Sequence, residues 1–135
     1  MAALSVPIPQ SSGGGGGSVI QGTPIQFQSG VLTTQSDLQI LLQIVVPELT
    51  QRFLYTAVIV CNIAGVVEIN YTNTQNETIL IGSDRTEAGV PKAVFTWWPP
   101  YQAGSGTLIT ITFQIREGAP QVPIEAYLMC SDVTV

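Results

Sequence analysis

The sequence predicts an all-β protein: an eight-stranded, jelly-roll-like β-sandwich with an extended N-terminal arm. Three observations lead to this prediction. From Ile25 onward, apolar and polar residues alternate with a period of two, which is typical of half-buried strands. Segments with this pattern recur roughly every 8–12 residues, as in sandwiches and barrels. Outside residues 47–54, which could hold one helical turn, the chain has no helical pattern.

The first 24 residues differ in composition from the rest and form the predicted arm. Two prolines precede a run of five glycines, residues 13–17. Such a segment lacks the apolar pattern that builds a core, so it is expected to behave as a flexible linker. We therefore divide the chain into an arm, residues 1–24, and a β-sandwich domain, residues 25–135. The apolar side chains expected to dock the arm on a partner are Val6, Ile8, Val19 and Ile20.

Eight strands are expected in the β-sandwich domain. They cover residues 25–28, 38–46, 53–63, 67–71, 78–81, 92–98, 108–116 and 122–130. Polar, glycine-rich or proline-rich segments separate them, including the predicted loop at 82–91 and the Pro99–Pro100 pair, which is expected to end its strand.

The alternation also assigns side chains to faces. The last two strands are expected to point Ile109, Ile111, Phe113, Ile115, Ile124, Ala126, Leu128 and Cys130 into the core. In the strand at 38–46, one face is expected to carry Leu38, Ile40, Leu42, Ile44 and Val46. The strand at 53–63 is apolar on both faces between Ala57 and Val60, which predicts burial on both sides or a position under a subunit contact.

Charged residues make up 10% of the chain, where about a quarter is ordinary, while 45% is apolar. A surface so poor in charge favours self-association unless a partner covers it, which indicates a component of an assembly. The net charge is −5 and the four basic residues are scattered, so neither nucleic acid nor an anionic membrane is an expected partner. The chain also has no apolar run long enough to span a bilayer and no signal-peptide pattern.

The chain has no histidine, and this excludes Ser-His-Asp triads, Cys-His pairs and histidine-ligated metals. Asp84 and Glu87 flank Arg85 in one predicted loop, but they lack the spacing of a calcium loop and are expected to be solvated. We therefore expect neither an enzyme nor a bound metal or cofactor. Cys61 and Cys130 are expected to be two buried thiols or, alternatively, one inter-strand disulfide.

The segment at residues 97–101 is the best candidate for a binding site. In a strand, Trp97 and Trp98 point to opposite faces, so one can join Phe95 in the core while the other lies outside. The outer tryptophan could cover a sheet end, contact a partner or stack on a sugar. The residues expected at a partner or subunit interface are Trp97, Trp98, Pro99, Pro100 and Tyr101, together with Val58 and Val60.

The layout of the whole chain, a Gly/Pro-rich arm at residues 1–24 joined to a histidine-free β-domain, resembles that of capsid decoration, or cement, proteins of bacteriophage virions. The resemblance implies a virion structural protein, assembled in the host cytoplasm, that forms a homotrimer and grips a major capsid or other virion protein with its arm. A tail-fibre or head-fibre knob would share this layout. The alternatives are a receptor- or carbohydrate-binding module that uses Trp98, Tyr101 and residues 73–76, and a bacterial surface or secretion-associated β-sandwich.

Overall fold

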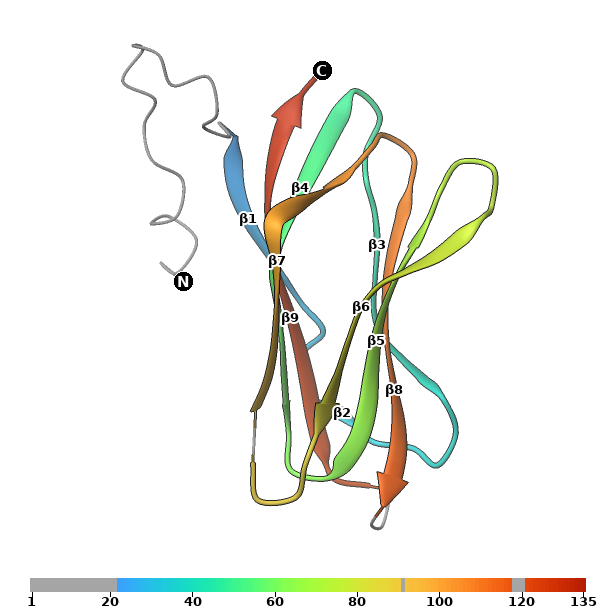
Figure 1. Cartoon of the computed structure of the whole chain (residues 1–135), viewed down its shortest axis with the longest axis vertical. Coiled ribbons are helices and arrows are strands. Elements are labelled where there is room, and N and C mark those ends of the chain that lie inside the picture. Colours follow the sequence, from blue (N-terminus) through green and yellow to red (C-terminus); the bar gives the residue numbers. More distant parts are fainter. Residues whose placement is uncertain (1–21, 91, 118–120) are drawn as a thin grey trace.

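The computed structural model describes residues 22–90, 92–117 and 121–135, which form two antiparallel β-sheets packed face to face (Figure 1). None of these residues is helical, so the described part of the chain contains no helix that could cross a membrane. The predicted all-β, two-layer architecture is confirmed. The strands are β1 (Thr23–Gln28), β2 (Leu32–Thr33), β3 (Gln39–Val45), β4 (Thr50–Cys61), β5 (Ala64–Thr72), β6 (Thr78–Thr86), β7 (Lys92–Ala103), β8 (Leu108–Glu117) and β9 (Pro123–Thr134).

Sheet A has the order β1-β9-β4-β7, with β2 also pairing with β9, and sheet B has the order β3-β8-β5-β6. The pairings are nested along the chain: β1 and β2 with β9, β3 with β8, β4 with β7, and β5 with β6. Two further pairings, β4 with β9 and β5 with β8, complete the sheets. The chain is therefore arranged as one long hairpin, with the β5–β6 turn at its tip, that is folded over on itself.

The core lies between the two sheets and is built mainly by alternation in the central strands, interrupted in β4 by a register shift between Leu54 and Thr56. In β8, Ile109, Ile111 and Phe113 are buried as predicted, and Ile115 packs half-buried against them. In β9 the four predicted side chains are buried, and Ser131, which was not predicted, is buried as well. Burying a large aliphatic or aromatic side chain contributes about 1.5–3 kcal/mol, so this layer is the main source of stability.

The N-terminal boundary differs from the prediction by two residues. Thr23 and Pro24 belong to β1, where they align with Asp132 and Ser131 of β9, and not to the arm. The described residues also form nine strands, where eight were expected. The additional strand, β2, is two residues long, which is too short for an alternating pattern to reveal it.

The face assignment of β3 was wrong in its first half. A bulge between Ile40 and Leu42 inserts one residue, so Gln39 and Leu41 face inward while Ile40 is exposed. After the bulge the prediction holds, and Ile44 is buried. Bulges change the face without changing the composition, so alternation alone does not reveal them.

The predicted ends of β6 and β7 were also wrong. Residues 82–86, expected in a loop, continue β6, because an edge strand tolerates polar and charged side chains. Gly82 lets β6 approach sheet A closely, since a Cβ there would lie 2.8 Å from the Phe95 ring. β7 likewise continues past Pro99 and Pro100, and this too is an edge strand, where proline is tolerated.

A charged side chain, Arg52, lies inside the sandwich with 3% of its surface exposed. Its Nε donates to Asp132 Oδ1 at 2.7 Å and its second terminal nitrogen donates to Oδ2 at 2.8 Å. Its remaining terminal nitrogen donates to the carbonyl of Val45 at 3.4 Å, and the guanidinium lies 4.6 Å from the centroid of the Phe27 ring. This side chain therefore connects three strands of sheet A with β3 of sheet B.

Candidate partner-binding surface

A wide bulge interrupts the pairing of β7 with β4. Thr56 aligns with Thr96, and Leu54 aligns with Tyr101, so Tyr55 alone opposes residues 97–100. The peptide bond between Trp98 and Pro99 is cis. We call residues 97–100 the β7 bulge. It lies at the edge of sheet A, where no further strand of the described chain covers it.

The two tryptophans of the bulge point in opposite directions. Trp97 is 7% exposed, its ring packs edge-on against Phe95 at 5.1 Å between centroids, and its Nε1 donates to the carbonyl of Ile81 at 2.9 Å. Trp98 is 89% exposed. The prediction that one tryptophan joins Phe95 and the other lies outside is confirmed. The prediction that Trp97 itself belongs to an interface is wrong, because its ring and its donor are used in the core.

Tyr101 lies between the sheets and not beside Trp98. It aligns with the buried Leu54, so it shares the inner face of sheet A. Its ring meets that of Tyr71 in sheet B at 5.4 Å between centroids and 65° between planes. Burial and the neighbouring Tyr71 raise the pKa of the Tyr101 hydroxyl. Of the five residues predicted at 97–101, only Trp98, Pro99 and Pro100 are therefore placed to meet a partner on the outside.

The outer face of sheet A carries an unusual number of apolar side chains on its central strands. Val58 aligns with Tyr127 on one side and Val94 on the other, and Val60 lies two residues further along β4. Val94 is 50% exposed, and Val58 and Tyr127 are half-buried. We call Val58, Val60, Val94, Tyr127 and Met129 the apolar face.

The prediction for β4 is thereby resolved in part. The strand is central, between β9 and β7, but its outer side chains are not buried by the described residues, since Val60 is 36% exposed. A position under a subunit contact stays a prediction. Val94, Tyr127 and Met129 were not predicted as site residues, although their alternation with the buried Ala93, Leu128 and Cys130 is visible in the sequence.

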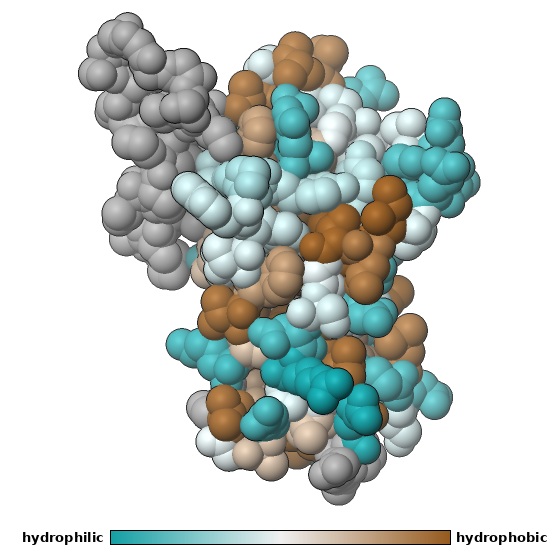
Figure 2. Space-filling model, in the orientation of Figure 1, coloured by the Kyte–Doolittle hydropathy of each residue, from teal (hydrophilic) through white to brown (hydrophobic). Residues whose placement is uncertain are grey.

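The outer face of sheet B is mostly polar on its central strands. Thr110 aligns with Gln43 and Asn70, and Glu68 aligns with Ser83. Its exposed apolar residues lie on the edge strands, Ile40 and Val45 on β3 and Ile79 and Leu80 on β6. Figure 2 shows brown apolar groups among teal polar ones on the side of the molecule where the edge strands β6 and β7 lie.

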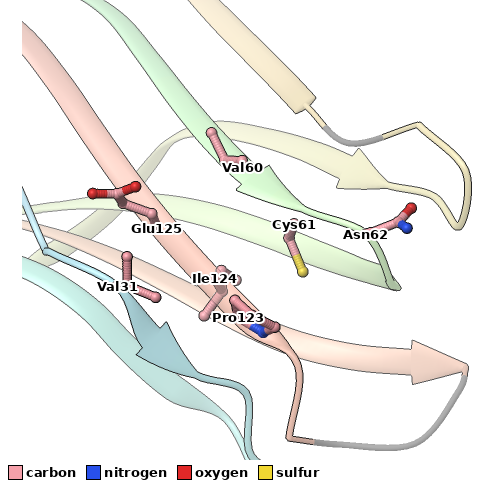
Figure 3. A pocket seen from close by; sticks show the side chains of 7 residues that line it. All are labelled: Val31, Val60, Cys61, Asn62, Pro123, Ile124 and Glu125. Carbon is pink, nitrogen blue, oxygen red and sulfur yellow. The ribbon is translucent and has the colours of Figure 1, made fainter.

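A cavity of about 250 Å³ opens at the end of β4, where β9 begins (Figure 3). Its lining is mostly apolar and consists of Val31, Val60, Cys61, Asn62, Pro123, Ile124 and Glu125. The Cys61 sulfur points toward Pro123 and Ile124. Burial raises the pKa of the Cys61 thiol, so the group stays protonated and a poor nucleophile at neutral pH.

Both cysteines are free and buried, which confirms the prediction of two buried thiols. Cys130 aligns with Leu54, so it lies seven positions, or about 20 Å, from Cys61 along β4. A disulfide needs Cα atoms within about 7 Å, so the alternative of one intrachain disulfide is wrong. Burial raises the pKa of Cys130 to about 12, against a smaller opposing effect of Arg52.

Within residues 22–90, 92–117 and 121–135, no three side chains of metal-ligating type come together. Val6, Ile8, Val19 and Ile20, predicted to dock the arm, lie outside the described residues. No protein-family model matches the chain, and a search of curated proteins finds no match either. The candidate site is therefore defined by geometry alone: the outward half of the β7 bulge and the apolar face.

Proposed function

We propose that this chain is a structural protein of a bacteriophage virion, a capsid decoration protein that binds the shell through the β7 bulge and its N-terminal arm. The observation that carries the proposal is Trp98, a large apolar side chain that is 89% exposed on the β7 bulge and is followed there by two prolines. Exposed tryptophan is rare on isolated domains and is enriched at the energetic centres of protein interfaces.

We propose further that the fold is a jelly roll. Since β1 and β2 both pair with β9, they count as one edge strand, and each sheet then has four strands. The nested pairings of β1/β2 with β9, β3 with β8, β4 with β7 and β5 with β6 support this assignment. Jelly rolls of eight strands in two sheets are common in viral capsid proteins, and also in lectins.

The composition supports an assembly component. Only 10% of the residues are charged, and large apolar side chains remain exposed on both sheets. In the proposal, Val6, Ile8, Val19 and Ile20 dock the arm on the shell. The first described residue, Gly22, lies against Ser131 and Asp132 at the β1 edge of sheet A.

The experiment that tests this proposal is co-sedimentation of the full-length protein with empty shells of the virion whose genome encodes it. Binding of the unaltered protein is expected, and Trp98→Ala is expected to weaken it by about 2 kcal/mol or more, roughly 30-fold in Kd. Val45→Ala is the matched control, because Val45 is also exposed but lies on sheet B. Shell binding that is equally strong in Trp98→Ala, or absent in the unaltered protein, contradicts the proposal.

The second candidate function is carbohydrate binding, which the same observation favours, because an exposed indole ring can stack on a sugar. Titration with glycans followed by tryptophan fluorescence separates the two. The buried Trp97 and the exposed Trp98 differ in their surroundings, so a sugar at Trp98 changes only the solvent-exposed part of the emission. A sugar-dependent change that is lost in Trp98→Ala supports the carbohydrate-binding function; the decoration proposal expects no change.

A further inference from the structure

We infer that the apolar face pairs with the apolar face of a second copy of this chain, about a twofold axis parallel to β4, so that Glu125 of each copy lies over Lys92 of the other. The inference concerns self-association and does not depend on the shell binding proposed above.

Outward side chains of β9, β4 and β7 align in rows that cross sheet A. One row runs Glu125–Val60–Lys92 over β9, β4 and β7, and the next runs Tyr127–Val58–Val94. Both rows have valine at the centre, on β4, and unlike partners at the sides.

Consider a twofold axis that lies between the facing copies and runs parallel to β4. It places β9 of one copy over β7 of the other, and β4 over β4. It therefore places Val60 over its equivalent and Glu125 over Lys92, twice per pair of copies. In the next row it places Tyr127 over Val94, an aromatic side chain over a β-branched one. The face is thus complementary to itself in charge as well as in hydropathy, as an interface between identical subunits requires.

Neither Lys92 nor Glu125 has an oppositely charged partner within the described residues. Among the described residues the only ion pair is the one between Arg52 and Asp132. Lys92 and Glu125 lie on either side of β4 with their backbones about 10 Å apart, and their side chains do not pair within one copy. Glu125 also raises the pKa of the adjacent Tyr127 hydroxyl. A lysine from a second copy would bring an opposite charge to this carboxylate.

The outer face of sheet A is close to the size that a stable pair of copies needs. With strands about 4.8 Å apart and about 3.3 Å per residue, four strands and the 12 residues of β4 give this outer face dimensions of roughly 19 by 40 Å, or roughly 750 Å². A stable interface buries about 800 Å² per partner, so a pair of copies has to use nearly the whole face. A threefold arrangement, which the resemblance to decoration proteins implies, would bring only part of each face against a neighbour and would leave the reciprocal rows unused.

The experiment uses charge reversal in the full chain, with mass measured by sedimentation velocity and native mass spectrometry. The unaltered protein is expected to be a dimer. Lys92→Glu alone puts two pairs of like charges in contact, as does Glu125→Lys alone, and each is expected to raise the dimer Kd by about 100-fold or more. Because both side chains lie on the surface, neither variant should change the circular dichroism spectrum or the melting temperature by more than a few degrees.

The decisive sample is a mixture of the two single variants, one of them isotopically heavier. In the mixed pair, position 92 of the Lys92→Glu chain lies over position 125 of the Glu125→Lys chain, and the unaltered Glu125 of the first chain lies over the unaltered Lys92 of the second, so opposite charges meet at both places. A heterodimer of near-original affinity is therefore expected from two variants that do not dimerise alone, and the variant carrying both substitutions should dimerise with itself.

Four outcomes overturn the inference: an unaltered protein that is monomeric, one that is trimeric, single variants that dimerise normally, or a mixture that does not form heterodimers. The charge-reversal samples contain no shells and keep Trp98 unchanged, so their outcome does not depend on whether Trp98→Ala binds the shell, and the two proposals fail separately.

Discussion

The two outer faces of the sandwich differ, although each belongs to an antiparallel sheet with the same number of central strands. On sheet A the central outward positions hold Val58, Val60 and Tyr127, and on sheet B they hold Thr110, Asn70 and Glu68. Both inner faces are apolar, because both cover the same core. The inner positions are thus determined by folding, while the outer positions are free to vary, and apolar residues there indicate a surface that another molecule covers.

The two sheets cover one common core, and Arg52 links them by contacting both. Changing Arg52 is therefore expected to have the largest effect on the free energy of unfolding. Arg52→Met removes the partner of Asp132 and the donor to the carbonyl of Val45, so we expect a loss of about 3–5 kcal/mol in the free energy of unfolding. Urea denaturation measures it, and hydrogen exchange should increase in β3 as well as β4.

The control for this variant is the double change Arg52→Met with Asp132→Leu. Replacing both members of a buried pair by apolar groups is often neutral, so the double variant should recover much of the loss. A single variant as stable as the original protein would mean that the two sheets do not depend on this side chain.

The difference between the outer faces of sheets A and B is tested most directly by placing a glutamate on a central strand of each. Val58→Glu places an unpaired carboxylate in the proposed dimer contact, and we expect the dimer Kd to rise by about 100-fold. Thr110→Glu is the matched control, since it too lies half-buried on a central strand, but on sheet B. Light scattering on a size-exclusion column measures both. Equal effects of the two variants would remove the distinction between the faces.

A smaller effect is expected from shortening exposed valines. Val94→Ala deletes two methyl groups from each copy, or four from the dimer contact. Because Val94 is already half-buried in the single copy (50% exposed), dimerisation gains only about half of the ~0.8 kcal/mol per group, so the loss of about 1.6 kcal/mol should weaken the dimer by roughly tenfold. Val45→Ala deletes the same groups from sheet B and should leave the Kd unchanged. The measurement is a dilution series in analytical ultracentrifugation, and a Val45→Ala effect as large as that of Val94→Ala would contradict the assignment.

The smallest expected effect is a change in the pH dependence of stability, caused by the Cys130 thiol in the core between the two sheets. The folded state raises the pKa of Cys130 from 9.0 to about 12, so folding favours the neutral thiol. Its contribution to stability is complete below pH 9 and is lost as the pH rises from 9 to about 12. At pH 10 we expect the free energy of unfolding to fall by about 1 kcal/mol more in the original protein than in Cys130→Ala. Identical pH profiles for the two proteins would show that water reaches the thiol.

Much of the fold was predictable because alternation reports directly on burial. The inward residues of β8 and β9, the central position of β4 and the opposite directions of Trp97 and Trp98 all follow from a period of two. The errors arose where this rule is locally broken. The bulge in β3 exchanges its faces, and the edge strands β6 and β7 continue through polar residues and prolines that would end a central strand.

The candidate site was predictable only in part. Trp98, Val58 and Val60 could be recognised from the sequence alone. Outward positions of a strand are usually polar, so a tryptophan or two valines at such positions are noticeable. Lys92 and Glu125 did not, because each is an ordinary charged residue in its own strand. They form one row with Val60 only when β9 and β7 align on either side of β4.

The strand-forming pattern, the composition of the core and the absence of histidine chemistry can all be read from the sequence, since they depend on residue type and on near neighbours along the chain. The choice of strand partners, the register shifts at bulges, the place of Trp97 in the core and the separation of the two thiols emerge only in the folded chain. The physical reason is that alternation specifies the side on which a residue lies relative to its neighbours in the same strand. Pairing between distant strands is chosen by the packing of the whole core, and no local pattern encodes it.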